Sequence, residues 1–103
     1  MAFDLRITGP LLKVLHEFLQ RPGMSMSGAD IARRANLKSG TLYPLLSRLE
    51  EAGLLLSKWE NVSPQEVGRP RRRLYEMTGL GVRQAKEAFR EVQAPSGVPA
   101  WSL

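Results

Sequence analysis

Cysteine is absent from the 103 residues, and histidine occurs once, as His16. Without cysteine the chain forms no disulfide and offers no thiolate to catalysis or to a metal. A single histidine leaves only carboxylates as metal ligands, so we expect neither a metal site nor a cofactor. His16 lies within a helical pattern with no catalytic partners around it, and a structural role is expected for it. No catalytic motif is present, so we expect that the protein is not an enzyme.

Long hydrophobic runs are also missing. No apolar stretch approaches the roughly 20 residues that cross a bilayer. Met1–Arg6 lacks the basic-then-apolar layout of a secretory signal. The composition, 43% hydrophobic and 24% charged, is typical of a globular protein, and the length suits one domain. We therefore expect a cytoplasmic protein with no membrane segment.

Acidic residues are missing from two stretches, Ile31–Leu49 and Arg69–Arg73. The net charge is +5, and these two stretches hold eight of the 15 basic residues. The rest of the chain has seven basic residues against ten acidic ones, so the positive charge is concentrated in two places. Such segregation indicates an anionic partner. The basic residues concerned are Arg33, Arg34, Lys38, Arg48, Arg69, Arg71, Arg72 and Arg73.

Two helices are predicted in the first third of the chain. The first opens at Gly9-Pro10 and ends at Pro22-Gly23. The second is expected to start at Ser27, which with Asp30 resembles a capping box. Apolar residues recur along the first helix at three- and four-residue spacing and form one stripe: Leu11, Leu12, Leu15, Phe18 and Leu19.

A third helix is expected to be capped by Ser39 or by Thr41. With Thr41 as the cap, Pro44 falls in the first turn and costs no helical hydrogen bond. Gly53 stands where a left-handed helix terminator is wanted. Four leucines at i, i+3, i+4 and i+7 predict a core face: Leu42, Leu45, Leu46 and Leu49.

Two strands are predicted next, Leu54–Trp59 and Arg72–Met77. The connection between them, Glu60–Arg71, is too long for a tight turn, and we expect it to be mobile at its tip. Trp59 is expected to pack in the core or on the hairpin, and contact with an apolar ligand is the alternative. A last helix, about 78–93, begins at Thr78 as its cap, and residues 94–103 read as a loose tail with Trp101.

This order of elements predicts a mainly α protein with a small two-stranded β-wing, a winged helix-turn-helix. Residues 1–93 form the domain in this prediction. The outer face of its third helix offers groups that donate hydrogen bonds to phosphates and base edges of duplex DNA. With the turn before it, this face comprises Lys38, Ser39, Gly40, Thr41, Tyr43, Pro44, Ser47 and Arg48.

The wing supplies the second candidate surface, Arg69, Arg71, Arg72 and Arg73. Guanidinium groups between strands bind a minor groove or a row of phosphates well. Strand alternation prevents all of them from pointing one way, so a subset is free to brace Glu60 or Glu76. A solubilising charge run explains the wing alone equally well. Together with the basic third helix, DNA binding is favoured.

The run from Ser39 to Leu54, SGTLYPLLSRLEEAGL, resembles the signature of PadR-like transcriptional regulators. Trp59-Glu60, the Gly68–Tyr75 segment GRPRRRLY, Thr78 and Gly81 extend the resemblance. Ala29 departs from it, because an aromatic residue is usual there.

The resemblance implies a homodimeric repressor on a palindromic operator, often released by a small aromatic or drug-like effector. No cluster of aromatics marks an effector pocket. Because no long C-terminal domain follows, the dimer is expected to rely on the first and last helices, through Leu11, Leu15, Phe18, Val82, Ala85, Phe89 and Val92. The alternative function is a winged-helix module that binds another protein, for which the wing loop Val62–Val67 and the tail with Val98 and Trp101 offer apolar side chains.

Overall fold

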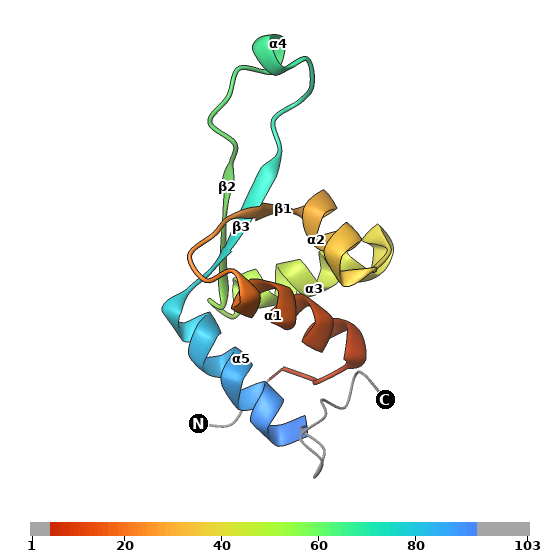
Figure 1. Ribbon diagram of the computed structural model, residues 1–103, viewed down its shortest axis with the longest axis vertical. Coiled ribbons are helices and arrows are strands. Elements are labelled where there is room, and N and C mark those ends of the chain that lie inside the picture. The colour runs from red at the N-terminus through yellow and green to blue at the C-terminus, as the bar shows by residue number, and fades with distance from the viewer. Residues whose placement is uncertain (1–4, 93–103) are drawn as a thin grey trace.

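The computed structural model describes residues 5–92 and forms a helical body from which a β-wing projects (Figure 1). The predicted winged helix-turn-helix is confirmed. The predicted tail, 94–103, lies outside the described residues. In chain order the elements are α1 (Gly9–Gln20), β1 (Met26–Ser27), α2 (Gly28–Ala35), α3 (Ser39–Glu51), β2 (Leu55–Trp59), α4 (Pro64–Val67), β3 (Arg73–Met77) and α5 (Gly79–Val92).

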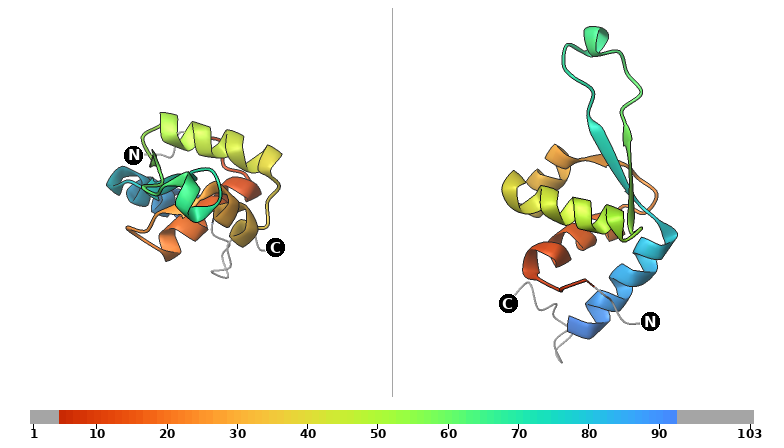
Figure 2. Two further views of the ribbon diagram at one scale, coloured as in Figure 1. Left: turned by 90° about the horizontal axis from the view of Figure 1, so that it is seen from above. Right: turned by 180° about the vertical axis from the view of Figure 1, so that it is seen from behind.

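Helix α1 forms the centre of the body, between α2 and α3 on one side and α5 on the other (Figures 1 and 2). Its first turn is capped by Thr8, whose Oγ1 accepts from the Leu11 backbone N–H at 3.2 Å. The predicted apolar stripe is confirmed, with only Leu19 left half-buried. His16 contacts the edge of Phe89 on α5, with ring centroids 6.3 Å apart.

Helix α2 begins where its capping residue predicted. Ser27 Oγ accepts from the Asp30 backbone N–H at 3.1 Å. The helix ends at Asn36, which has a left-handed φ of 54°. Asparagine tolerates this conformation better than most residues, and the tight turn aims α3 across α1.

Helix α3 starts earlier than a cap at Thr41 requires. Its N-cap is Lys38, without a side-chain hydrogen bond, so the expected cap by Ser39 or Thr41 is wrong. Pro44 consequently lies inside the helix, beyond the first turn. A proline there leaves the carbonyl of Gly40, four residues earlier, without its helical donor. Burial of Leu42, Leu46 and Leu49 stabilises the helix nonetheless.

The sheet has three strands, in the order β1-β3-β2, rather than the two expected. The third is β1, which pairs antiparallel with β3 through Met26 opposite Tyr75 and Ser27 opposite Leu74. Two residues are too few to show the alternation that identifies a strand. Strands β2 and β3 pair from Leu55 opposite Met77 to Trp59 opposite Arg73. The connection between β2 and β3 holds the single turn α4.

One hydrophobic core joins the four longer helices and the sheet. It contains the buried leucines of α1 and α3, Ile31 of α2, Leu55 and Met77 of the strands, and Ala85 and Ala88 of α5. The predicted leucine face of α3 is confirmed, with Leu45 half-buried and packed against the core. Trp59 takes the second of its two expected positions, on the wing, where it is 60% exposed. Among residues 5–92, none of the helices is both long and apolar enough to span a bilayer.

Candidate nucleic-acid interface

The outer face of α3 points away from the core, as its leucine spacing predicts. Thr41, Tyr43, Pro44, Ser47 and Arg48 are all exposed. At the helix start the Ser39 and Gly40 backbone N–H groups have no intrahelical acceptor, because first-turn donors never do. Their exposure leaves them available to an anion such as a phosphate.

Tyr43 connects α3 with the wing. Its ring packs over Gly28, so closely that a Cβ on Gly28 would lie 2.8 Å from Tyr43 Cε1. The phenol borders a hollow of about 140 Å³ at the root of the wing. The hollow is lined by Ser27, Gly28, Ala29, Tyr43, Arg72, Arg73 and Tyr75. The two candidate surfaces of the sequence analysis therefore meet, through Tyr43 and two wing arginines, around one hollow.

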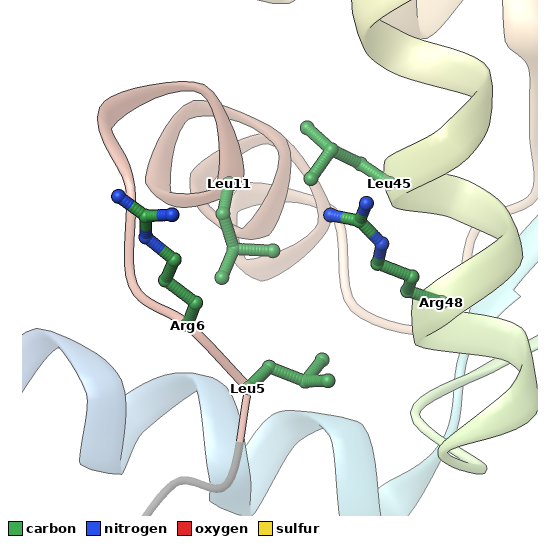
Figure 3. A pocket seen from close by; sticks show the side chains of 5 residues that line it. All are labelled: Leu5, Arg6, Leu11, Leu45 and Arg48. Carbon is green, nitrogen blue, oxygen red and sulfur yellow. The ribbon is translucent and has the colours of Figure 1, made fainter.

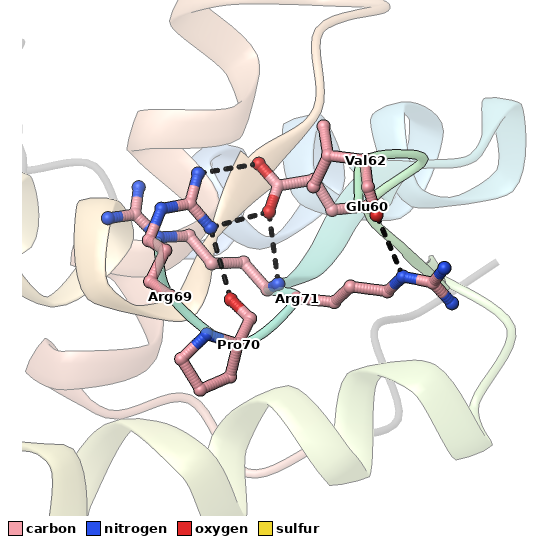
Figure 4. Close-up of polar contacts among 6 residues, drawn as sticks. Glu60, Val62, Arg69, Pro70 and Arg71 are labelled. Carbon is pink, nitrogen blue, oxygen red and sulfur yellow. Dashed lines mark hydrogen bonds and ion pairs between the residues drawn. The ribbon is translucent and has the colours of Figure 1, made fainter. Parts of the chain in front are cut away.

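At the far end of the wing, Glu60 holds Arg69 (Figure 4). Arg69 Nη1 and Nη2 donate to the two Glu60 carboxylate oxygens at 2.7 and 3.1 Å. The Arg72 backbone N–H adds a third bond to that carboxylate, at 3.1 Å. The side-chain bond from Arg69 lowers the pKa of Glu60 to about 2, with help from the Arg72 backbone. Arg69 is therefore turned toward Glu60, which fulfils the expectation that some wing arginines brace an acid.

Arg71 and Arg72 are the more available cations of the wing. Arg71 Nε donates to the Val62 carbonyl at 2.9 Å (Figure 4), while the residue stays exposed. The side chain of Arg72 is exposed and has no hydrogen bond or ion pair within residues 5–92. A guanidinium without an internal hydrogen bond keeps its donors available to a phosphate.

Arg73 ties the wing to α3. Its Nε donates to Ser57 Oγ at 3.1 Å, and Ser57 Oγ in turn donates to the Glu50 carboxylate. Arg73 Nη2 lies 3.9 Å from the same Glu50 oxygen. The guanidinium also sits over Trp59, 5.1 Å from the ring centroid. These contacts, here called the Glu50–Ser57–Arg73 brace, link α3 with β2 and β3. Arg73 therefore positions the wing relative to α3.

The residues expected to form a dimer divide into two groups. Leu11, Leu15, Phe18 and Ala85 are at most 2% exposed and pack inside their own chain. Buried side chains have no surface for a partner, so the dimerisation prediction remains only for the half-buried Val82, Phe89 and Val92.

Several contributors were not found from the sequence. Gly28, Glu50 and Ser57 gave no signal, because their partners are distant along the chain and brought near only by the fold. The sequence predicts Glu60 as one of two acids that brace a wing arginine, but it gives no sign that Trp59 lies under Arg73. Within residues 5–92 no group of three or more His, Asp or Glu side chains is placed to hold a metal.

Three helices on a small sheet with a projecting basic wing define the class of winged helix-turn-helix transcription regulators. The sequence profile of the transcriptional regulator PadR-like family matches residues 11–87. The chain belongs to this family. The members of this family are transcriptional regulators and not enzymes, in agreement with the sequence analysis. No curated protein sequence matches the chain.

Several solved structures are similar to the chain. The PcaV transcriptional regulator from Streptomyces coelicolor, bound to its natural ligand, is 26% identical with a TM-score of 0.63, over 80% of this chain and 52% of PcaV. The protein smu.1704 from Streptococcus mutans UA159 is 27% identical with a TM-score of 0.62, over 85% of this chain and 81% of smu.1704. MepR of Staphylococcus aureus, a transcription regulator of the multidrug efflux pump MepA, shares the fold at 22% identity and a TM-score of 0.65. The match covers 86% of this chain and 58% of MepR. The chain spans about half the length of PcaV.

Proposed function

We propose that the protein is a sequence-specific regulator that binds double-stranded DNA in the cytoplasm, as a homodimeric repressor on a palindromic operator. The observation that carries the proposal is the hollow at the wing root, where Tyr43 of α3 faces Arg72 and Arg73 of β3 and its approach. A duplex laid across it would meet α3 in its major groove and the wing on its backbone. The family and the position of the basic stretches support the same function.

Selection of bound fragments from the source genome, followed by fluorescence anisotropy with the selected duplex, tests this function. Binding should weaken steeply with salt, because phosphate neutralisation releases counterions. Arg72→Ala should weaken all duplexes alike and reduce the salt slope by about one. Tyr43→Ala and Arg48→Ala should also lower the preference for the selected sequence over a scrambled one.

Lys86→Gln on α5 is the matched control, because it removes one exposed charge outside the proposed surface. If Arg72→Ala and Tyr43→Ala bind like the Lys86→Gln variant, the surface is wrong. Selected half-sites one helical turn apart, about 34–36 Å, support the dimer. Half-sites without symmetry contradict it.

Release by a small aromatic or drug-like effector belongs to the proposal as well. It is supported by the family resemblance and by PcaV, which holds its natural ligand. A thermal-shift screen of aromatic acids and cationic drugs tests it, and a compound that binds should also lower duplex affinity. Compounds that bind without any effect on the duplex contradict release.

A protein-binding module is the second candidate, favoured by the apolar tip of the wing. Trp59 is 60% and Val67 41% exposed. An open hollow of about 690 Å³ is lined by Trp59, Pro64, Pro70 and Arg71. Exposed aromatic and proline side chains are common in protein interfaces. Salt-insensitive capture of a protein that Trp59→Ser abolishes, with no binding to any genomic duplex, favours this function over DNA binding.

A further inference from the structure

Two outward side chains of α3 differ in what surrounds them. Arg48 borders an open space between α1, α3 and the segment that precedes α1 (Figure 3). This hollow has a volume of about 230 Å³ and is lined by Leu5, Arg6, Leu11, Leu45 and Arg48. The Arg48 guanidinium therefore has room for more than one orientation. Tyr43, in contrast, lies directly on the backbone of Gly28, the first residue of α2.

Position 28 needs a glycine for reasons of space rather than of backbone conformation. Gly28 lies at the start of a regular helix and does not have the left-handed φ of Gly23, Gly53 and Gly68. Alanine adopts this helical backbone freely and is the better helix former. A Cβ at position 28 would nevertheless lie 2.8 Å from both Cε1 and Cζ of Tyr43. The tyrosine ring thus occupies the space that a side chain on Gly28 would fill.

Packing alone holds the Tyr43 ring in place. The residue is 45% exposed, and its hydroxyl has no hydrogen bond within residues 5–92. The ring also lies outside the hydrophobic core. If a Cβ were added to Gly28, the ring would have to tilt away from α2, and its exposed end is free to do so. The added atom would therefore misplace the phenol without disrupting the core.

The size of this displacement matters for recognition. To move from 2.8 Å to an ordinary contact of 3.4 Å, a ring carbon must retreat by about 0.6 Å, and the hydroxyl must retreat further. Groups that recognise a ligand have to be held within roughly 0.5 Å of the productive geometry. The phenol borders the hollow at the wing root, together with Arg72 and Arg73. A tilted ring would change the position of the hydroxyl at this junction of α3 and the wing.

We propose that Gly28 is a positioning residue for DNA recognition: by leaving room beneath the ring, it fixes the Tyr43 hydroxyl in the orientation that reads the preferred sequence. This inference rests on the proposed function, in which Tyr43 contacts the duplex. Gly28 acts through Tyr43. The first helix of the helix-turn-helix, α2, thereby contributes to the sequence preference of the second, α3.

The quantity to measure is the ratio of the affinities for the selected duplex and the scrambled one, by anisotropy at fixed salt. Gly28→Ala should lower this ratio by about fivefold or more, the low end of what one base contact contributes. The salt slope should keep its parental value, because no charge is lost. Gly9→Ala is the matched control. Gly9 is likewise the first residue of its helix, α1, and a Cβ there would have nothing within 4 Å.

A double variant separates positioning from a structural role. In the Tyr43→Ala background the ring is absent, so Gly28→Ala should cause no further loss of the affinity ratio. The denaturation midpoints of Gly28→Ala and Gly9→Ala should both be close to the parental value, because an exposed ring yields without opening the core. NOEs between the Hα protons of residue 28 and the Tyr43 ring should be present in the parent and weaken in Gly28→Ala.

Three results overturn the positioning role. The first is an equal affinity ratio for Gly28→Ala and Gly9→Ala. The second is the same loss from Gly28→Ala with and without the Tyr43 ring. The third is a Gly28→Ala variant that unfolds at a clearly lower denaturant concentration than Gly9→Ala, because the ring would then be a fixed part of the packed body.

The positioning role and the proposed function can fail separately. A chain that prefers its selected duplex but is insensitive to Gly28→Ala keeps DNA binding and loses only the positioning role. A chain that binds no genomic duplex overturns the proposed function, and the positioning role with it.

Discussion

Glu60 receives three hydrogen bonds, two from Arg69 and one from the Arg72 backbone. All three favour its ionised form, which explains why its pKa lies near 2 although the carboxyl is near the surface. The pair holds the two sides of the wing together behind its tip and presents the Arg71–Arg72 backbone in one conformation. Arg69 thus stabilises the wing through its pair with Glu60.

We expect the pKa of Glu60, measured by NMR titration of its carboxyl carbon, to be about 2 in the folded protein. Because the folded pKa is below the unfolded value of 4.5, ionised Glu60 stabilises the wing fully above pH 4.5. That contribution is lost as the pH falls toward 2. Arg69→Gln should return the pKa to the ordinary range. A midpoint near 4.5 in the parent protein contradicts the bidentate pair.

Gly81 shows how closely α5 approaches the strands. A Cβ there would collide with the Leu54 carbonyl oxygen and lie 2.7 Å from Met77 Cγ. The carbonyl belongs to the backbone that leads into β2 and cannot swing aside like the end of a side chain.

Gly81→Ala should therefore lower the free energy of unfolding by about 1–3 kcal/mol, the usual cost of overpacking. Chemical denaturation measures it. Gly79→Ala is the control in the same helix, because a Cβ there has its nearest neighbour at 3.8 Å. Equal stabilities of the two variants would show that α5 does not approach Leu54 and Met77 this closely.

At the scale of elements, the Glu50–Ser57–Arg73 brace fixes the orientation of the wing relative to α3. Removal of Glu50 has two opposite consequences for a DNA-binding protein. Loss of an anion near the interface favours phosphate binding. Loss of the brace frees Arg73 and loosens the angle between α3 and the wing, which lowers affinity because the two surfaces must be aligned again on binding.

We expect alignment to dominate, so Glu50→Ala should weaken binding of the selected duplex by several-fold, a loss near 1 kcal/mol. Glu50→Gln, which keeps a hydrogen-bond acceptor for Ser57 and loses the charge, should bind at least as well as the parent. Anisotropy titrations at fixed salt measure both. Tighter binding of the duplex by Glu50→Ala would mean that the charge of Glu50 affects DNA affinity more than the brace does.

As a whole the molecule is more extended than a compact domain. Its Cα radius of gyration is 14.4 Å, whereas a compact chain of this length has about 13 Å. The difference reflects the wing, which projects along the long axis from the helical body (Figure 1).

A homodimer in solution should have twice the 11.5 kDa mass of the chain and a radius of gyration clearly above 14.4 Å. Size-exclusion chromatography with light scattering and small-angle X-ray scattering measure these two quantities. Phe89→Arg on α5 should shift the mass toward that of one chain if α5 forms the interface. A parent protein that elutes at the single-chain mass contradicts the homodimer.

Local signals determined the four longer helices, their order and the winged architecture. Ser27 caps α2, the leucine spacing aims α3, and Gly53 ends it with a φ of 78°. These interactions act within one or two turns, so they can be predicted from neighbouring residues. The exposure of Tyr43 and Arg48 followed from the same periodicity.

Contacts between distant segments depend on the tertiary structure. Strand β1 exists because β3 pairs with it, Arg73 reaches Ser57 across sixteen positions, and Arg6 meets Arg48 at one hollow because α1 crosses α3. A sequence shows which arginines are present, and their charge is enough to indicate an anionic partner. Which of them bind that partner is decided by acids from elsewhere in the chain, because a guanidinium paired with a nearby carboxylate is no longer free for a phosphate.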